Sequence, residues 1–438
     1  MRALPSILYF CAFISLLISL LYTYRSSNMA TTSALKNIIV VGGSYVGKST
    51  AQELARNLPA SHRVLLIEPH SHFHHLFAFP RFAILPGHEH KAFIPYTHLF
   101  SSVSNSAHAP TRHSVIQARV LSIAPNHVNL DKAWAESSST TIPFEYLVLA
   151  TGTRLSEPAG MSDDDKVSSV AYLRRHQDQI KSAKSILIAG GGAVGVQMAT
   201  DLKEIYPEKS VTVVQSRERL MPQYHERLDG IIRGRFGELG VKFITGSRIK
   251  VPESGFPSTT PFTVRTTTGS ELPGKYDFVI LATGQTPNND LINSLPISPS
   301  NTTGSLINPS NGFIRIKPTM QFADEAYPHL FAVGDIADTG LRKAARPGNA
   351  QAQTVVKNIM ALVEGQQARE EYPRQPAGIH LSLGLKYNIV FRNPNEAEGQ
   401  TEPTVIERDD GRDDMGVEGW WERLGFKGDG KEAPQYHL

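Results

Sequence analysis

The chain has 438 residues, of which 40% are hydrophobic and 19% are charged, and its formal net charge is +3. This length and composition indicate a folded protein of about two or three domains. A charge so close to balance gives no support for a nucleic-acid partner or a strongly acidic one. The one cysteine is Cys11, so the chain can form neither an internal disulfide nor a redox pair of cysteines. We therefore expect the folded part to lie in a reducing compartment.

The first feature in chain order is an uncharged run over residues 3–24, bracketed by Arg2 and Arg25. An apolar helix of about 20 residues can span a bilayer. The alternative is a cleaved signal peptide, whose apolar region is usually about 7–15 residues long and ends in a small-residue cleavage site. The run is longer and ends in "LYTYRSSN", so we expect an uncleaved, single-pass membrane anchor. The following domains are expected in the cytosol, at the mitochondrial outer membrane or the endoplasmic reticulum.

Residues 38–50 read "IIVVGGSYVGKST", which predicts a strand, a glycine-rich turn and a helix. One interpretation is a P-loop, G-x-x-x-x-G-K-S, which binds the phosphates of a nucleoside triphosphate. The other is a dinucleotide fingerprint, G-x-G-x-x-G, in which Ser44 replaces the second glycine. Glu68 ends the next strand, at the distance where a dinucleotide fold places an acid for the ribose hydroxyls, so we favour the second interpretation. The residues expected to bind the dinucleotide are Gly42, Gly43, Ser44, Tyr45, Val46, Gly47 and Glu68. Lys48 is expected on a solvated helix face.

Six histidines crowd the next segment, at positions 70, 72, 74, 75, 88 and 90. Their spacing fits no standard metal-ligand motif. We interpret them as polar loop residues or residues of a cofactor pocket, and we predict no metal site.

The pattern of strand, turn, helix and strand then repeats. Residues 184–202, "KSILIAGGGAVGVQMATDL", carry an intact fingerprint in Gly190, Gly192 and Gly195. Each copy is followed by a strand that ends in Ala-Thr-Gly, the first at Gly152 and the second at Gly284. Such a duplication predicts two turns that each hold a pyrophosphate at a helix start.

The second copy differs from the first at the acid position, which falls near Gln215, with Arg217 close behind. An acid there would repel a 2′-phosphate, whereas an arginine attracts it. The residues therefore favour NADPH, or use of both NADPH and NADH.

The tail begins at about residue 366 and carries Val417, Trp420, Trp421 and Leu424 at helical spacing. Two interpretations stay open. The tryptophans could meet a membrane interface or shape a quinone entrance, or the tail helix could pack on the protein's own core.

The strands ending in Ala-Thr-Gly, together with "LFAVGDIA" at 330–337, resemble the two-dinucleotide-binding flavoproteins. The stretches "GGGAVGVQMAT", "DLKEIYPEKSVTVVQSRERL" and "SHFHHLFAFPRFAILPGHEHKAFIPY" are similar to apoptosis-inducing-factor-like oxidoreductases of the ferroptosis-suppressor type. The similarity covers about residues 37–365. It implies FAD in the first turn and NADPH or NADH in the second, with contacts to FAD from Asp335, Arg81 and the backbone of Val120. It also implies transfer of hydride to the flavin, which then reduces a lipid-soluble quinone.

We therefore predict an α/β fold of two Rossmann-like domains. An FAD-binding domain spans 36–155 and 285–365, an NAD(P)-binding domain spans 156–284, and a C-terminal region spans 366–438. The predicted function is an FAD-dependent NAD(P)H oxidoreductase with a quinone-type acceptor, and no side chain stands out as a general acid or base. The alternatives are a flavin-dependent monooxygenase or tailoring enzyme of a small metabolite, a redox-sensing cell-death factor with low turnover, and a nucleoside triphosphatase.

Overall fold

The computed structural model describes residues 35–101, 112–257, 261–299, 304–341, 343 and 345–427. The expected membrane anchor at residues 3–24 lies outside these ranges. Within them, no helix combines the length and the apolar character that crossing a bilayer requires.

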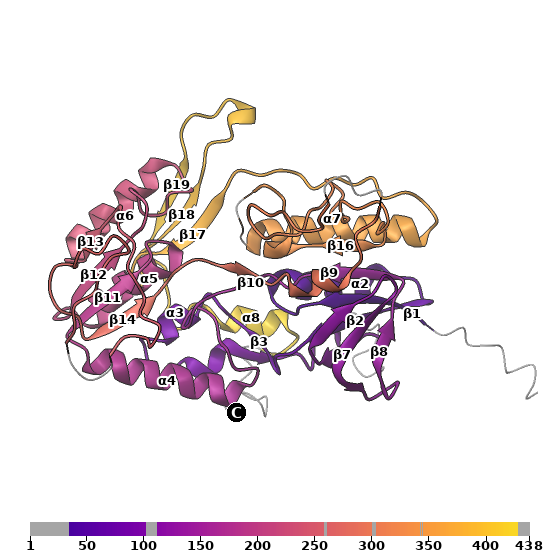
Figure 1. Cartoon of the computed structure of the whole chain (residues 1–438), viewed down its shortest axis with the longest axis horizontal. Coiled ribbons are helices and arrows are strands. Elements are labelled where there is room, and N and C mark those ends of the chain that lie inside the picture. The colour runs from indigo at the N-terminus through magenta and orange to yellow at the C-terminus, as the bar shows by residue number, and fades with distance from the viewer. Residues whose placement is uncertain are drawn as a thin grey trace, which may run out of the picture.

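The first lobe is built on a five-stranded parallel sheet with the strand order β16-β9-β1-β2-β5. Its strands are β1 (Lys36–Val41), β2 (His62–Glu68), β5 (Ser114–Gln117), β9 (Tyr146–Leu149) and β16 (Leu330–Ala332). Strands covered on both faces read as continuous apolar runs, and every residue of β1 after Lys36 is buried. Helices α2 (Tyr45–Asn57) and α7 (Ala345–Val363) pack against each other over this sheet (Figure 1). A small antiparallel sheet of β6 (Val120–Ile123), β7 (His127–Trp134) and β8 (Ser139–Pro143) completes the lobe.

The second lobe repeats the plan with a four-stranded parallel sheet in the order β13-β12-β11-β14. Its strands are β11 (Ser185–Ala189), β12 (Ser210–Val214), β13 (Lys242–Ile244) and β14 (Phe278–Leu281). Its helices are α4 (Lys166–Ser182), α5 (Ala193–Ile205) and α6 (Glu226–Leu239). The chain crosses between the lobes on β10 (Thr153–Arg154) and β15 (Thr286–Pro287), which pair in antiparallel fashion (Figure 1). The predicted α/β fold with two Rossmann-type domains is confirmed.

The histidine-rich segment joins the lobes. It forms the strand pair β3 (His72–His74) and β4 (Phe93–Pro95), the short helix α3 (Phe79–Phe82) and the 3₁₀ turn η1 (Glu89–Ala92). Phe79 and Phe82 are fully buried in the core of the second lobe. The segment therefore provides apolar packing between the lobes. Further 3₁₀ turns in the described ranges are η3 (Asp290–Ser294), η4 (Gly334–Ile336) and η5 (Glu396–Glu398).

The C-terminal region has two parts. Its antiparallel sheet comprises β17 (Gly378–Ser382), β18 (Asn388–Arg392) and β19 (Thr404–Arg408) and lies against the second lobe beside α5 and α6 (Figure 1). Helix α8 (Glu418–Arg423) docks on the first lobe, where Trp421 is fully buried and its indole N–H donates to the carbonyl of Lys91 at 3.0 Å. Of the two interpretations of the tail, packing on the protein's own core holds for Trp421.

Candidate functional site: two glycine-rich turns and a buried arginine

The first glycine-rich turn follows β1 and leads into α2. Gly42 has φ of +100°, and a Cβ added there would lie 2.4 Å from the carbonyl oxygen of Ala150. A Cβ at Gly47 would lie 1.9 Å from the carbonyl oxygen of Gly42. Both positions therefore require glycine, one for its backbone conformation and the other for the close approach of helix and strand.

The second turn, between β11 and α5, has the same geometry. Gly190 has φ of +121°, and its Cβ would meet the carbonyl oxygen of Ala282 at 2.2 Å. A Cβ at Gly195 would lie 1.9 Å from the carbonyl oxygen of Gly190. Ala150 and Ala282 are the alanines of the two Ala-Thr-Gly motifs, so each motif is the strand end against which its turn packs. The internal duplication seen in the sequence is thus also a duplication of the close contacts in the two turns.

Ser44 and Gly192 occupy equivalent positions as the N-caps of α2 and α5. Both have extended backbone, and neither helix start has a side-chain cap bond. A Cβ at Gly192 would have no heavy atom within 4 Å, so a serine fits this position without strain. The first N–H groups of a helix have no intrahelical partner and attract anions. Both helix starts therefore offer free donors where a pyrophosphate would bind, and the second turn also leaves open space there.

The side chain of Lys48 points away from the first turn. Its ammonium group donates to the Gln52 amide oxygen at 3.3 Å, one helical turn farther on. Burial lowers the pKa of Lys48 to about 8, and the nearby charges of Arg423 and Arg56 act in the same direction. The prediction that Lys48 lies on a solvated helix face is wrong, because α8 and the adjacent loops cover it. Its orientation also gives no support to the P-loop interpretation.

The acid positions of the two copies are occupied differently. In the first copy, the N–H of Gly43 donates to the Glu68 carboxylate at 2.5 Å. In the second, the N–H of Gly191 donates to the Gln215 amide oxygen at 3.2 Å. The same backbone donor therefore meets a carboxylate in one turn and a neutral amide in the other. Gln215 is the structural counterpart of Glu68.

Asp335 lies in η4, at the end of β16 and close to the first turn. The hydroxyl of Thr153 donates to its carboxylate at 3.5 Å. The N–H of Gly334 donates to the Gln351 side chain of α7 at 2.7 Å. A Cβ at Gly348 would lie 2.1 Å from the side chain of Val46. The structure thus brings the starts of α2 and α7 and the Gly-Asp motif close together.

Three residues that lie beside the first glycine-rich turn were not predicted from the sequence. They are Gly348 and Gln351 at the start of α7, and Tyr96, whose hydroxyl donates to the carbonyl oxygen of Gly43 at 3.0 Å. The Pro-Gly pair at the beginning of α7 was a usable signal for Gly348. No local pattern marks Tyr96, because its contact joins positions far apart in the chain.

An aromatic cluster surrounds Tyr45 at the start of α2. Its ring stacks on Phe77 at 4.6 Å and meets the edges of Trp420 at 4.9 Å and Phe73 at 5.2 Å, measured between ring centroids. The hydroxyl of Tyr45 bonds to Nδ1 of His75 at 2.8 Å. Burial lowers the pKa of His75 to about 3, with a further contribution from the charge of Arg423, so this imidazole is neutral at physiological pH. These five residues are called the Tyr45 cluster below.

Of the other histidines of the segment, His74 is buried and the rest are half-buried. Burial lowers the pKa of His72 to about 4 and places that of His74 well below its ordinary value. Burial acts in the same direction on His70, but the hydrogen bond and the charge of Glu68 outweigh it and raise the His70 pKa. Within the ranges that the structure describes, no three His, Cys, Asp or Glu side chains are grouped to hold a metal ion.

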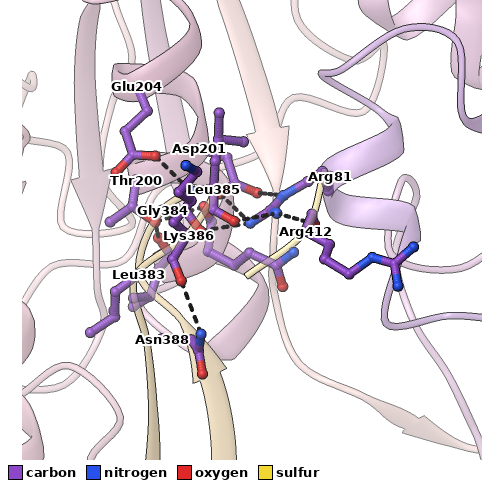
Figure 2. Close-up of polar contacts among 12 residues, drawn as sticks. Arg81, Thr200, Asp201, Glu204, Leu383, Gly384, Leu385, Lys386, Asn388 and Arg412 are labelled. Carbon is purple, nitrogen blue, oxygen red and sulfur yellow. Dashed lines mark hydrogen bonds and ion pairs between the residues drawn. The ribbon is translucent and has the colours of Figure 1, made fainter. Parts of the chain in front are cut away.

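Arg81 lies at the centre of a buried network between the lobes, shown in Figure 2. Its guanidinium forms a bidentate pair with Asp201 of α5, at 2.9 and 2.8 Å. It also donates to the carbonyl oxygens of Gly384 at 2.7 Å, Leu385 at 3.1 Å and Arg412 at 3.0 Å. A guanidinium has five N–H donors, and these bonds use all of them. The side chain is 1% exposed.

This placement gives no support to the expectation that Arg81 contacts FAD, because all five N–H donors are used within the protein and the side chain is buried. Arg81 instead joins α3, α5 and the C-terminal region. Val120, the other contact implied by the resemblance, is the buried first residue of β6. Gly152 and Gly284 follow β9 and β14 with open space beside them. Arg217 lies in the second lobe after β12, at the edge of a cavity.

Comparison with known proteins places this geometry in context. Residues 36–358 match the family model described as pyridine nucleotide-disulphide oxidoreductase. Fe-regulated protein 8 of Mycosarcoma maydis is 32% identical over 411 residues, covering 90% of this chain and 96% of that protein. Ferroptosis suppressor protein 1 of Homo sapiens is 26% identical over 371 residues, covering 82% of this chain and 89% of that protein. Among solved structures, the sulfide:quinone oxidoreductase of Aquifex aeolicus gives a TM-score of 0.67 at 17% identity, over 88% of this chain and 90% of that one. At this identity the structural likeness supports the fold alone.

Proposed function

Because the chain belongs to the pyridine nucleotide-disulphide oxidoreductase family, and within it to the apoptosis-inducing-factor-like members, we propose that it passes electrons from NAD(P)H through FAD to a quinone-type acceptor. The chain is an FAD-dependent NAD(P)H oxidoreductase by family. The acceptor and the residues that receive it are the proposed part.

The residues of the first lobe fit FAD. The open helix start at Ser44 suits the pyrophosphate, and the Glu68 carboxylate suits the ribose hydroxyls. Asp335 lies where the starts of α2 and α7 converge. In the second lobe, Gly192 leaves the corresponding space for the pyrophosphate of NAD(P)H. When bound, FAD would supply the redox chemistry between coenzyme and acceptor, while the protein supplies binding and orientation.

The single observation that carries the proposed acceptor is the cysteine count. The sequence has one cysteine, Cys11. Family members that pass electrons through a cysteine pair need two, so here the electrons go from the flavin directly to a diffusible acceptor. The resemblance to the ferroptosis-suppressor type favours a lipid-soluble quinone as that acceptor.

The Tyr45 cluster is the proposed place for the acceptor ring. Phe77 is 50% exposed and Trp420 is half-buried, so the cluster offers an aromatic surface beside the first turn of α2. Aromatic rings favour offset-stacked or edge-to-face contacts with other flat rings, worth about 0.5–1.5 kcal/mol each. A quinone headgroup provides such a ring, with a lipid-like tail that suits apolar surroundings.

The test uses the full chain, purified in detergent with its flavin, under anaerobic conditions. We expect a yellow protein that consumes NADPH or NADH rapidly only when a short-chain ubiquinone is present. Phe77→Ala and Trp420→Ala should raise the KM for the quinone without slowing reduction of the flavin by the coenzyme. Trp134→Ala, on β7 and outside the cluster, serves as the matched control. NADPH consumption that needs oxygen and a metabolite, or flavin bleaching without turnover of any quinone, would contradict the proposal.

We further propose that residues 3–24 anchor the protein in a membrane in a single pass. The support is the length of the uncharged run in the sequence. Full-length protein should stay with membranes after alkaline carbonate washing, whereas a chain beginning at Met29 should be released. Release of both forms would contradict the anchor.

A further inference from the structure

A cavity of about 240 Å³ opens in the second lobe where β12 ends. Three segments line it: residues 216–217 after β12, the turn 246–248 after β13, and the threonines 266–268. Pockets for whole drug-sized ligands usually measure about 300–1,000 Å³. This cavity therefore suits one part of a larger ligand that continues outside it.

Backbone hydrogen bonds hold the three segments together. The N–H of Gly246 donates to the carbonyl oxygen of Arg217 at 3.0 Å, and the N–H of Ser247 donates to that of Gln215 at 3.1 Å. The N–H of Thr267 donates to the carbonyl oxygen of Arg248 at 2.8 Å. The shape of the cavity is thus set by the fold and needs no ligand to form.

The lining carries two positively charged side chains, Arg217 and Arg248. Among the described residues, neither Arg217 nor Arg248 forms an ion pair, whereas the neighbouring Arg265 pairs with Glu271 at 3.0 Å. Hydroxyl groups from the serines and threonines complete the lining. The carboxylate of Glu218 packs against Gly246 and is not among the lining residues. Two guanidinium groups with surrounding hydroxyls are the donors that a phosphate monoester prefers.

The position of the cavity indicates which phosphate group of a dinucleotide it would receive. Gln215, the last residue before the lining begins, bonds to the N–H of Gly191 in the second glycine-rich turn. In dinucleotide-binding folds the residue at this position faces the adenosine ribose, and an acid there selects an unphosphorylated 2′-hydroxyl. The structure has a neutral amide at that position and two arginines beyond it.

We propose that this cavity binds the 2′-phosphate of NADPH, so that Arg217 and Arg248 select NADPH over NADH. Gln215 contributes because its neutral amide lacks the negative charge that Glu68 carries at the equivalent position of the first turn. The inference concerns the coenzyme end of the proposed function and does not depend on which acceptor the flavin reduces.

The test measures binding of coenzyme fragments to the flavin-loaded full chain by titration calorimetry. We expect 2′,5′-ADP to bind at least about tenfold more tightly than 5′-AMP, since charge-assisted hydrogen bonds contribute strongly. The difference should disappear in the double variant Arg217→Ala/Arg248→Ala and persist in the matched control Arg265→Ala. Gln215→Glu, which leaves both arginines in place, should reduce it as well.

A second readout is anaerobic reduction of the flavin by NADPH and by NADH, with no acceptor present. The double variant should lose its preference for NADPH and keep its rate with NADH. Equal binding of 2′,5′-ADP and 5′-AMP by the unmodified protein would overturn the inference. Inorganic phosphate that competes as well as 2′,5′-ADP would also overturn it, by showing an anion site unrelated to the coenzyme. A failure of the quinone proposal leaves all these measurements unchanged.

Discussion

Replacing Arg81 with methionine should destabilise the protein severely, whether or not FAD is bound. Methionine keeps much of the apolar bulk but removes the partner of Asp201, which is fully buried. It also leaves the carbonyl oxygens of Gly384, Leu385 and Arg412 without their donor. Burial raises the pKa of Asp201, against the opposing effect of Arg81, so a lone Asp201 would be an uncompensated buried acid.

The expected loss in the free energy of unfolding is several kcal/mol. Removing one partner of a buried ion pair costs about 3–5 kcal/mol, whereas an exposed pair contributes about 0–1 kcal/mol. With a urea slope of about 3 kcal/mol per molar, the unfolding midpoint should fall by roughly 1 M or more. The double variant Arg81→Met/Asp201→Leu should recover part of the loss, because it removes the stranded carboxylate but not the stranded carbonyl oxygens.

Urea unfolding followed by far-ultraviolet circular dichroism, on flavin-loaded and flavin-free protein, checks this expectation. Arg265→Met is the matched control, because it breaks an exposed pair with Glu271. If Arg81 acted by holding FAD, Arg81→Met would weaken flavin binding and leave the stability of the flavin-free protein unchanged. That result would refute the structural role argued for Arg81.

Two further predictions follow from the geometry. Gly42→Ala should lower the flavin content at least about tenfold, because its Cβ would lie 2.4 Å from the Ala150 carbonyl oxygen and such overpacking costs about 1–3 kcal/mol. Ser44→Gly should keep the flavin. Visible absorbance per protein measures the flavin content of both variants, and loss of flavin in Ser44→Gly would make the Ser44 hydroxyl a phosphate ligand. Burial lowers the pKa of His176 to about 4, against its hydrogen bond to the Ala83 carbonyl. The unfolded chain therefore takes up a proton at this histidine below about pH 6.5 while the folded protein does not. The contribution of His176 to the free energy of unfolding should be fully present above that pH and should fall towards pH 4 by up to about 3 kcal/mol. Urea midpoints measured at several pH values should fall less for His176→Gln than for the unmodified protein. Equal falls in the two proteins would contradict this role of His176.

Local sequence signals predicted the repeated part of the fold because each one has a local cause. The turns at Gly42 and Gly190 need a positive φ, and each third glycine lets a helix approach its strand. These requirements lie within a few residues of the motif, so the pattern and the structure agree. The same holds for Glu68, whose place at the end of β2 follows from the apolar run before it.

The surroundings of Lys48 and Arg81, which the sequence did not predict, depend on partners far away in the chain. Lys48 is covered by the tail helix α8, and Arg81 is held by α5 and by residues of the C-terminal region. No periodicity at either position reports such partners. For Arg81 the resemblance implied a contact with FAD, whereas the bonds seen in the structure run to Asp201 and to carbonyl oxygens of the C-terminal region.

The duplicated turns also show where specificity can arise without changing the motif. Both turns place the same backbone N–H opposite the residue that ends the second strand. A change from carboxylate to amide at that one residue removes a negative charge without altering the turn. As proposed above, coenzyme choice then falls to side chains outside the fingerprint. Arg248 lines the cavity from a segment after β13 that no dinucleotide motif includes. In this proposal the fingerprint determines that a dinucleotide binds, and the surrounding loops determine which one.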